Sequence, residues 1–289
     1  MNSNHIHNGT AKKILSVVAA VGLLASVAAC GSANSSEDVT VVKVALTTSS
    51  DEPIWEQVNK NLKNAGEKIK VEPVAMKSAV LGNQALVAGD VDLSAQQHYA
   101  FLNGEIKTKG YEISAIAETY LSPLNIYSNK LKSIKGLKKG DKILIPNDVT
   151  NGGRALTVLQ AAGVIKLNPD KVDPANGVYP AQEDITENKL DVQLVPTDRN
   201  LIMGSLDDAA AGIANANAVV DFGRSVNDNI FAVDLNPKSA INKPWINVIV
   251  ARSKDKDSEV YRKIIKAYHT DSVKKVIKDT LDGSVLPVW

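Results

Sequence analysis

Cysteine and histidine are scarce in this sequence of 289 residues, which contains one cysteine and four histidines. His5 and His7 fall in the segment assigned below to a cleaved leader, and only His98 and His269 remain beyond it. No group of His and Cys residues has the spacing of metal ligands, so we expect no metal site and no cofactor. The cysteine and histidine side chains that often act in catalysis are few, and we expect that the protein is not an enzyme.

An excess of charge of either sign is also missing, since 33 Lys and Arg stand against 32 Asp and Glu and give a net charge of +1. The lysines are interspersed with acids throughout the chain. This distribution lacks the electrostatic footprint of a nucleic-acid-binding protein, and we expect no nucleic-acid partner. It is typical of a solvated surface.

The apolar run near the N-terminus is too short to span a bilayer comfortably. It covers residues 14–29, follows Lys12 and Lys13, and ends in SVAAC. This is the pattern of a secretory signal peptide, and the small residues before Cys30 resemble a bacterial lipobox, in which a peptidase cuts before the cysteine and the cysteine is then acylated. A lipid explains why an exported protein keeps one unpaired cysteine. The alternative is an ordinary cleaved signal with a free thiol.

We assign residues 1–29 to a lipoprotein signal peptide and residues 30–39 to the lipidated Cys30 with a flexible tether. The sequence after Cys30, GSANSSEDVT, consists of small and polar residues that suit such a tether. We therefore expect the protein to be anchored through its lipid to the extracytoplasmic face of the cell membrane, without spanning the membrane.

Strands and helices are predicted to alternate in two successive blocks of the remaining chain, which is long enough for two lobes with separate cores. The first block begins with a strand at residues 39–47. The second contains predicted strands and helices in the order 142–148, 152–163, 190–197, near 200–208, and 209–220. This alternation of strands and helices in two blocks favours two α/β lobes with mixed sheets. Sheets of this kind bind ligands beyond the carboxyl ends of their strands.

Strands on either side of Pro123 are predicted to cross between the lobes, and an apolar strand at 245–253 is predicted to return the chain to the first lobe. We therefore assign lobe I to residues 40–121 and 236–289, and lobe II to residues 122–235.

The segment IPNDVTNGGRAL, residues 145–156, holds the clearest candidate for a binding residue. It lacks the lysine of a Walker loop and the three spaced glycines of a dinucleotide fingerprint. Its helix start, capped by Thr150 or Asn151, would favour an anion. Arg154 in the first helical turn adds a planar guanidinium group, which can bind a carboxylate through two hydrogen bonds. The alternative is that Arg154 is a surface residue paired with a nearby acid.

Residues 127–167 resemble the signature region of the NlpA-type lipoprotein family, the substrate-binding proteins of methionine ABC transporters. Further stretches, among them NQALVAGDVD, QHYAFL and WINVIVAR, extend the resemblance over nearly the whole mature chain. The residues of the signature that match are Pro123, Leu124, Ile126, Tyr127, Ser128, Lys130, Pro146, Asn147, Asp148, Asn151, Arg154, Ala155 and Leu156.

The resemblance implies a bilobed periplasmic-binding-protein fold of type II character, with a small amino-acid-like ligand between two mixed-sheet lobes joined by crossing strands. It also implies an ABC permease and its ATPase as partners. Carried over by position, it makes Arg154 the partner of the ligand carboxylate and Asn215 and Asn247 the partners of its amino and carboxyl groups. The remaining predicted members of the ligand site are His98, Gln96, Ala79, Tyr120 and Asn151.

Several positions depart from the family pattern, in which aromatic residues line the side-chain pocket. Phe101 and Trp245 stand where the family has tyrosines, so those sites stay aromatic. Ala79, Gln96 and Ala218 stand where the family has aromatic residues, so the pocket should be larger and more polar than a methionine slot. The ligand is then methionine, or a more polar amino acid or a short peptide. A surface lipoprotein with an adhesive or enzymatic role is the other alternative.

Overall fold

The structure is a computed structural model that describes residues 39–289. The predicted signal peptide, Cys30 and all but the last residue of the predicted tether lie outside the described residues. Within residues 39–289, no helix combines the length and the apolar character needed to cross a membrane.

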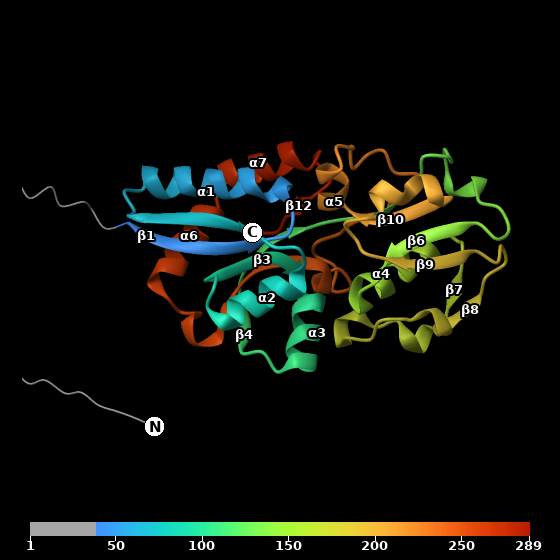
Figure 1. The fold of residues 1–289 in the computed structure, drawn as a ribbon, viewed down its shortest axis with the longest axis horizontal. Helices are drawn as coiled ribbons and strands as arrows, with labels where there is room; N and C mark the ends of the chain where they lie inside the picture. Colours follow the sequence, from blue (N-terminus) through green and yellow to red (C-terminus); the bar gives the residue numbers. More distant parts are fainter. Residues whose placement is uncertain (1–38) are drawn as a thin grey trace, which may run out of the picture. The chain divides into compact units, whose positions relative to one another are not determined.

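A six-stranded mixed sheet is built from the two ends of the described chain (Figure 1). Its strand order is β12-β4-β11-β3-β1-β2, in which β1 is parallel to β2 and β3, and β11 is antiparallel to β3 and β4. The predicted late strand therefore returns to the first sheet. The strands are β1 (Thr40–Leu46), β2 (Ile69–Ala75), β3 (Leu93–His98), β4 (Ile113–Leu121), β11 (Ile246–Arg252) and β12 (Leu286–Pro287).

Helices cover both faces of this sheet because the side chains along each strand alternate between them. Val44 of β1 packs in a core with α1, α6 and α7, whereas the next residue, Ala45, packs with α2 and α3. Figure 1 shows α1 and α7 on one side of the strands and α2 and α3 on the other. The helices are α1 (Glu52–Asn64), α2 (Ala79–Ala88), α3 (Tyr99–Lys109), α6 (Glu259–Tyr268) and α7 (Asp271–Thr280).

A second, four-stranded sheet has the order β5-β10-β6-β9, with β5 antiparallel to β10 and the other pairs parallel. Helix α4 (Val149–Ala161) packs on one face, and a 3-10 helix at Met203–Asp208 packs on the other. A small two-stranded sheet pairs β7 with β8. The strands are β5 (Leu124–Tyr127), β6 (Lys142–Pro146), β7 (Lys166–Leu167), β8 (Ile185–Glu187), β9 (Gln193–Thr197) and β10 (Ala211–Asn215).

The chain crosses between the two sheets on either side of Pro123, as predicted, because β4 belongs to the first sheet and β5 to the second. On the way back, α5 (Ala216–Asp221) follows β10, and Ala216 packs in the core of the six-stranded sheet. Phe231 then pairs with Ile126 of β5 before the chain enters β11. The α/β fold is the bilobed binding-protein fold, while the exact lobe boundaries stay a prediction.

Two predicted elements differ from the structure. The strand expected at 209–220 ends at Asn215, because the chain turns there into α5. The helix expected near 200–208 is a 3-10 helix that begins only at Met203. Apolar residues that recur at every third or fourth position fit both a short 3-10 helix and an α-helix, so this spacing does not distinguish them.

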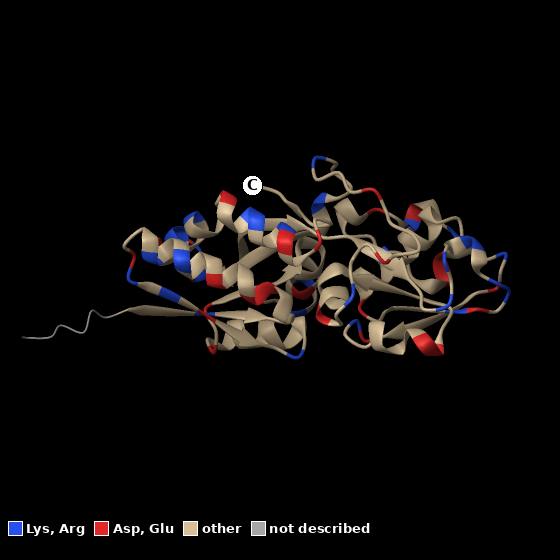
Figure 2. Cartoon of the chain, turned by 90° about the horizontal axis from the view of Figure 1, so that it is seen from above, with Lys and Arg blue, Asp and Glu red and all other residues tan. Residues whose placement is uncertain are grey.

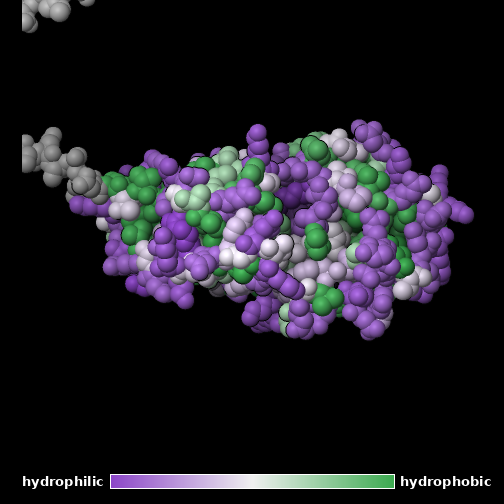
Figure 3. All heavy atoms as spheres, turned by 60° about the horizontal axis from the view of Figure 1, so that its bottom comes forward, coloured by the Kyte–Doolittle hydropathy of each residue, from purple (hydrophilic) through white to green (hydrophobic). Residues whose placement is uncertain are grey.

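Basic and acidic residues lie side by side over the described chain, as the sequence indicated (Figure 2). On the face drawn in Figure 3, hydrophobic residues are set among hydrophilic ones. Exposed apolar side chains of this kind are ordinary for a folded surface.

Candidate functional site

A pocket lies at the carboxyl ends of strands from both sheets, where α/β sheets bind ligands. It is lined by Thr47, Thr48 and Asp51 after β1, by Gln96 to His98 at the end of β3, by Asn147 and Asp148 after β6, by Asp198, Arg199 and Asn200 after β9, and by Asn215 and Asn217 at and after β10. Its volume of about 150 Å³ is that of a cavity that holds a benzene-sized molecule. The pocket therefore suits a small molecule.

The structure brings the predicted ligand-site residues together in this one pocket. All eight of them line it, although they come from six different elements and from both sheets. They are Ala79, Gln96, His98, Tyr120, Asn151, Arg154, Asn215 and Asn247. Their contacts with a ligand remain a prediction.

Helix α4 places Arg154 in the pocket, but its start differs from the prediction. The helix begins at Val149, and its N-cap is Asp148, whose carboxylate accepts a hydrogen bond from the backbone N–H of Asn151 at 2.9 Å. Neither Thr150 nor Asn151 is the cap. Arg154 consequently lies in the second turn of the helix, and not in the first turn as predicted. The free backbone N–H groups belong to the first turn.

The guanidinium of Arg154 is buried, with only 4% of the residue exposed. Its Nη2 donates to the backbone oxygen of Ser122 at 2.8 Å, and its Cζ lies 4.9 Å from the centre of the Trp245 ring. Within residues 39–289 no carboxylate forms an ion pair with it, so the alternative of a surface arginine paired with an acid is wrong. Burial lowers the pKa of Arg154 to about 9, and the group is still a cation at neutral pH.

His98 is held in one orientation by hydrogen bonds at both ring nitrogens. The backbone N–H of Phe101 donates to Nδ1 at 3.1 Å, so the proton of the neutral ring is on Nε2, which donates to Oδ1 of Asn151 at 3.1 Å. Asn151 is oriented in turn by Asp148, to which its Nδ2 donates. Burial, together with the charge of Arg154, lowers the pKa of His98 to about 4. The neutral ring bridges the two sheets.

Asp51 is a second buried charge of the pocket and was not predicted from the sequence. Its carboxylate accepts hydrogen bonds from Thr48 at 2.7 Å, from Tyr120 at 2.8 Å and from Asn217 at 3.1 Å. Only 5% of the residue is exposed. Burial raises the pKa of Asp51 to about 6, more than these hydrogen bonds lower it.

The raised pKa of Asp51 predicts a pH-dependent stability. Between about pH 6 and pH 3.8 the folded protein takes up a proton on Asp51 that the unfolded chain does not bind. Protonation of Asp51 therefore contributes about 1–3 kcal/mol to the stability of the folded state as the pH is lowered through this range, while the lowered pKa of His98 acts in the opposite direction, so the effect of Asp51 is measured against Asp51→Asn. Urea unfolding at pH 7.5 and pH 4 measures the free energy of unfolding of wild type and of Asp51→Asn. The difference, wild type minus Asp51→Asn, should be larger at pH 4. The same difference at both pH values would contradict the buried, ionisable carboxyl.

Three buried polar atoms on the pocket lining have no hydrogen-bond partner in the described structure: Oε1 of Gln96, Oγ of Ser122 and Oδ1 of Asn215. A buried polar atom without a partner costs about 1–3 kcal/mol. Two of the three are amide oxygens, which only accept hydrogen bonds. A ligand that donates hydrogen bonds would satisfy these acceptors.

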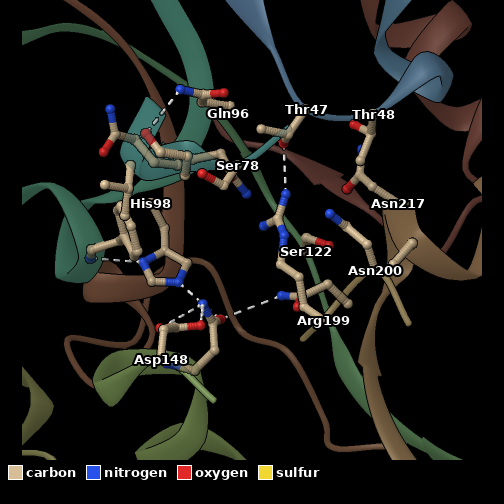
Figure 4. A pocket seen from close by; sticks show the side chains of 18 of the residues that line it. Thr47, Thr48, Ser78, Gln96, His98, Ser122, Asp148, Arg199, Asn200 and Asn217 are labelled. Carbon is tan, nitrogen blue, oxygen red and sulfur yellow. Dashed lines mark hydrogen bonds between the residues drawn. The ribbon is translucent and has the colours of Figure 1, made fainter. Parts of the chain in front are cut away.

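Several pocket residues were missed because they stand in turns after strands. Arg199 follows β9, and its Nη2 donates to Oγ1 of Thr47 at 2.6 Å, which links the two sides of the pocket (Figure 4). The polar turn after β1 and the acidic and basic residues after β9 were the available signals, since both follow strands of parallel pairs. Ala218 and Phe101 also line the pocket, whereas Trp245 packs behind Arg154 and His98.

The fold and the pocket define a bilobed α/β binding protein with a site for a small polar molecule. The chain belongs to the NlpA lipoprotein family, whose sequence model matches residues 42–289. The resemblance stated from the sequence is thereby confirmed.

Relatives and solved structures support this membership over most of the chain. The D-methionine-binding lipoprotein MetQ of Salmonella typhimurium is 34% identical over 277 residues, which is 94% of this chain and 97% of the relative. A nutrient binding protein from Burkholderia cenocepacia, solved bound to methionine, is 33% identical with a TM-score of 0.78 and covers 86% of this chain and 100% of its own. The substrate binding protein of a methionine transporter from Streptococcus pneumoniae has the same identity and TM-score, covering 86% of this chain and 96% of its own.

Proposed function

We propose that the protein is a lipid-anchored substrate-binding protein of an ABC importer, which captures an amino-acid-like ligand between its two lobes and delivers it to the permease and its ATPase. The observation that carries this proposal is Arg154, a buried cation that faces the pocket without an acidic partner among the described residues. Leaving a charge buried and unpaired is costly, so a ligand carboxylate is its natural partner. The named relatives that bind methionine support the same class of ligand.

The amino group of such a ligand would meet the orphaned Oδ1 of Asn215. The amide of Asn215 is oriented by its Nδ2, which lies 3.4 Å from Oδ1 of Asn151, so the oxygen is left for a donor. Asn247 would contact the amino and carboxyl groups of the ligand from the side of the six-stranded sheet. Its Nδ2 donates to the backbone oxygen of Tyr120 at 3.3 Å. This arrangement suits a zwitterion.

Capture works by a shift between open and closed lobes, because a ligand that contacts both sides favours closure. Contacts across the two sides already join the lobes in the structure: His98 of β3 with Asn151 of α4, and Arg199 with Thr47. Catalysis is not part of this mechanism. Both ring nitrogens of His98 are engaged in hydrogen bonds, so this histidine is not free to act as a base on a bound ligand.

Calorimetric titration of the detergent-solubilised full chain tests the proposal. We expect at least one free amino acid or dipeptide to bind with a micromolar or lower Kd, and its carboxamide derivative to bind at least about 30-fold more weakly, because the amide removes the charge that pairs with Arg154. L-methionine and L-methioninamide form the first matched pair, and polar amino acids and dipeptides follow. Equal binding of acid and amide, or no binding by the whole panel, would contradict it.

The lipid anchor rests on Cys30, which lies outside the described residues, and on the names of relatives that are lipoproteins. We expect the wild-type protein to fractionate with membranes and to carry an added acyl mass on the peptide that begins at Cys30. Cys30→Ser should lose both the acyl mass and the cleavage before residue 30, and therefore keep its leader. A wild-type peptide that begins at Cys30 with an unmodified thiol would show that the anchor is wrong.

A further inference from the structure

A side-chain hydrogen bond crosses the pocket between the turns that follow β1 and β9. Nη2 of Arg199, after β9, donates to Oγ1 of Thr47, after β1, at 2.6 Å. The two strands belong to different sheets, β1 to the six-stranded sheet and β9 to the four-stranded sheet. A hydrogen bond from a charged donor is stronger than one between neutral groups. This bond therefore joins the two sides of the pocket directly.

The turn that carries Thr47 is fixed by contacts of its own. Thr47 follows directly on β1, which pairs with β2 along its whole length. Beyond it, the carboxylate of Asp221 on α5 accepts hydrogen bonds from the backbone N–H of Ser49 at 3.1 Å and of Ser50 at 2.9 Å. The hydroxyl of Thr47 is thus presented to Arg199 from a well-supported turn.

The turn that carries Arg199 is also fixed on its own sheet. Strand β9 pairs with β6 up to its last residue, Thr197. Asp198 then accepts a hydrogen bond from the backbone N–H of Asn200 at its side chain and another from that of Leu201 at its backbone oxygen, both at 2.9 Å. Because each turn is held on its own sheet, a movement that separates the sheets pulls the guanidinium away from the hydroxyl.

The Arg199–Thr47 bond lies apart from the contact between His98 and Asn151. Figure 4 shows Thr47 at one side of the pocket and Asp148, which orients Asn151, at the opposite side. The two sides of the pocket are therefore joined at two separate places.

We propose that Arg199 and Thr47 form a latch that holds the lobes closed over the ligand, so that Arg199 slows the release of the ligand by acting through Thr47. A ligand leaves from the open form, and opening requires this bond to break. The inference rests on the proposed function, because it takes capture to work by closure of the lobes. It gives Arg199 a role in the rate of release and not in the choice of ligand.

Stopped-flow tryptophan fluorescence of the full chain in detergent measures the rate of release, since Trp245 packs against Arg154 and reports on the site. L-methionine is the probe, replaced by the tightest-binding member of the titrated panel if L-methionine does not bind. Arg199→Met keeps an apolar stem and removes the donors, while Thr47→Val keeps the shape and removes the acceptor.

We expect each of these two substitutions to raise the dissociation rate about 5- to 30-fold and to change the association rate less than about threefold. The effect is moderate because Arg199 and Thr47 are both partly exposed. The double variant should release the probe no faster than either single variant within about twofold, because each substitution alone removes the same bond.

Two control variants accompany this measurement. Thr47→Ser keeps the hydroxyl and should release the probe within about threefold of the wild-type rate. Arg262→Met makes the same change as Arg199→Met on the exposed side of α6 and should behave as wild type. Thermal unfolding shows whether each variant is folded. Should Arg199→Met fail to fold, the comparison of Thr47→Val with Thr47→Ser tests the bond from its other end.

The outcomes separate the latch from the proposed function. Wild-type release from both single variants overturns the latch, and so do effects that multiply in the double variant, since Arg199 and Thr47 would then act separately. Faster release from Arg199→Met with wild-type release from Thr47→Val also overturns it, because Arg199 would then bind the ligand directly. In each of these cases, binding that is lost in Arg154→Ala leaves the proposed function standing. If no member of the panel binds to wild type, the proposed function fails and the latch fails with it.

Discussion

Arg154→Ala is expected to weaken the affinity for the ligand by about 2–5 kcal/mol, which is about 30-fold to several thousand-fold. The ligand carboxylate would lose its charged partner inside a site from which water is largely excluded. Arg154 is only 4% exposed and makes one hydrogen bond to the backbone of Ser122, and α4 carries no other arginine or lysine. The other arginine of the pocket, Arg199, donates to Thr47. Calorimetric titration with the best wild-type ligand measures the change.

The matched control is Arg262→Ala. Arg262 is exposed on α6 and donates to the backbone oxygen of Asp257, outside the pocket. It makes the same change of charge without touching the site, and we expect affinity within about twofold of wild type. An Arg154→Ala protein that is folded and binds as the control does would favour the adhesive or enzymatic alternatives.

Gly153→Ala is expected to destabilise the protein, whereas the same change at Gly104 is expected to stabilise it. A Cβ on Gly153 would lie 2.8 Å from Cβ of Tyr179 and 3.0 Å from the backbone oxygen of Pro180, so α4 or that loop must move. Overpacking of this kind costs about 1–3 kcal/mol. Because Tyr179 packs against Trp245, 5.8 Å away between ring centres, the shift should also loosen the support behind Arg154.

Gly104 is the control because it also lies within a helix, α3, and the nearest atom to its added Cβ is 3.9 Å away. Replacing a helical glycine by alanine gains up to about 1 kcal/mol. Because both glycines lie within helices, this gain applies to both variants, and urea unfolding should separate them by the overpacking cost of about 1–3 kcal/mol. If both variants gain stability equally, the close approach of the loop to α4 is wrong.

The sequence predicted the order of strands and helices because strongly apolar strands and amphipathic helices alternate clearly in both halves of the chain. It failed where an element is short. The residues after Asn215 have the apolar character of a strand but form α5, since packing of Ala216 in the core of the other sheet overrides the local preference. The N-cap was placed two or three residues late because Asp148, Thr150 and Asn151 are all good caps.

The site was predicted as far as the family resemblance reached. It placed Arg154 and the seven other residues in one pocket, which composition and periodicity alone do not show. Asp51 and Arg199 were missed because each lies in a polar turn whose side chains meet the pocket only after the two sheets come together. Their proximity depends on contacts between residues about 150 positions apart, such as Arg199 with Thr47.

Native mass spectrometry of the purified full chain, released from detergent, tests most directly that Arg154 holds a small carboxylate in this pocket. We predict that wild type carries one bound molecule of amino-acid or dipeptide mass, or takes one up from an equimolar amino-acid mixture, and that Arg154→Ala carries none while Arg262→Ala carries it as wild type does. Equal occupancy in the Arg154→Ala protein, or an empty wild-type protein after incubation with amino acids and dipeptides, would contradict the account.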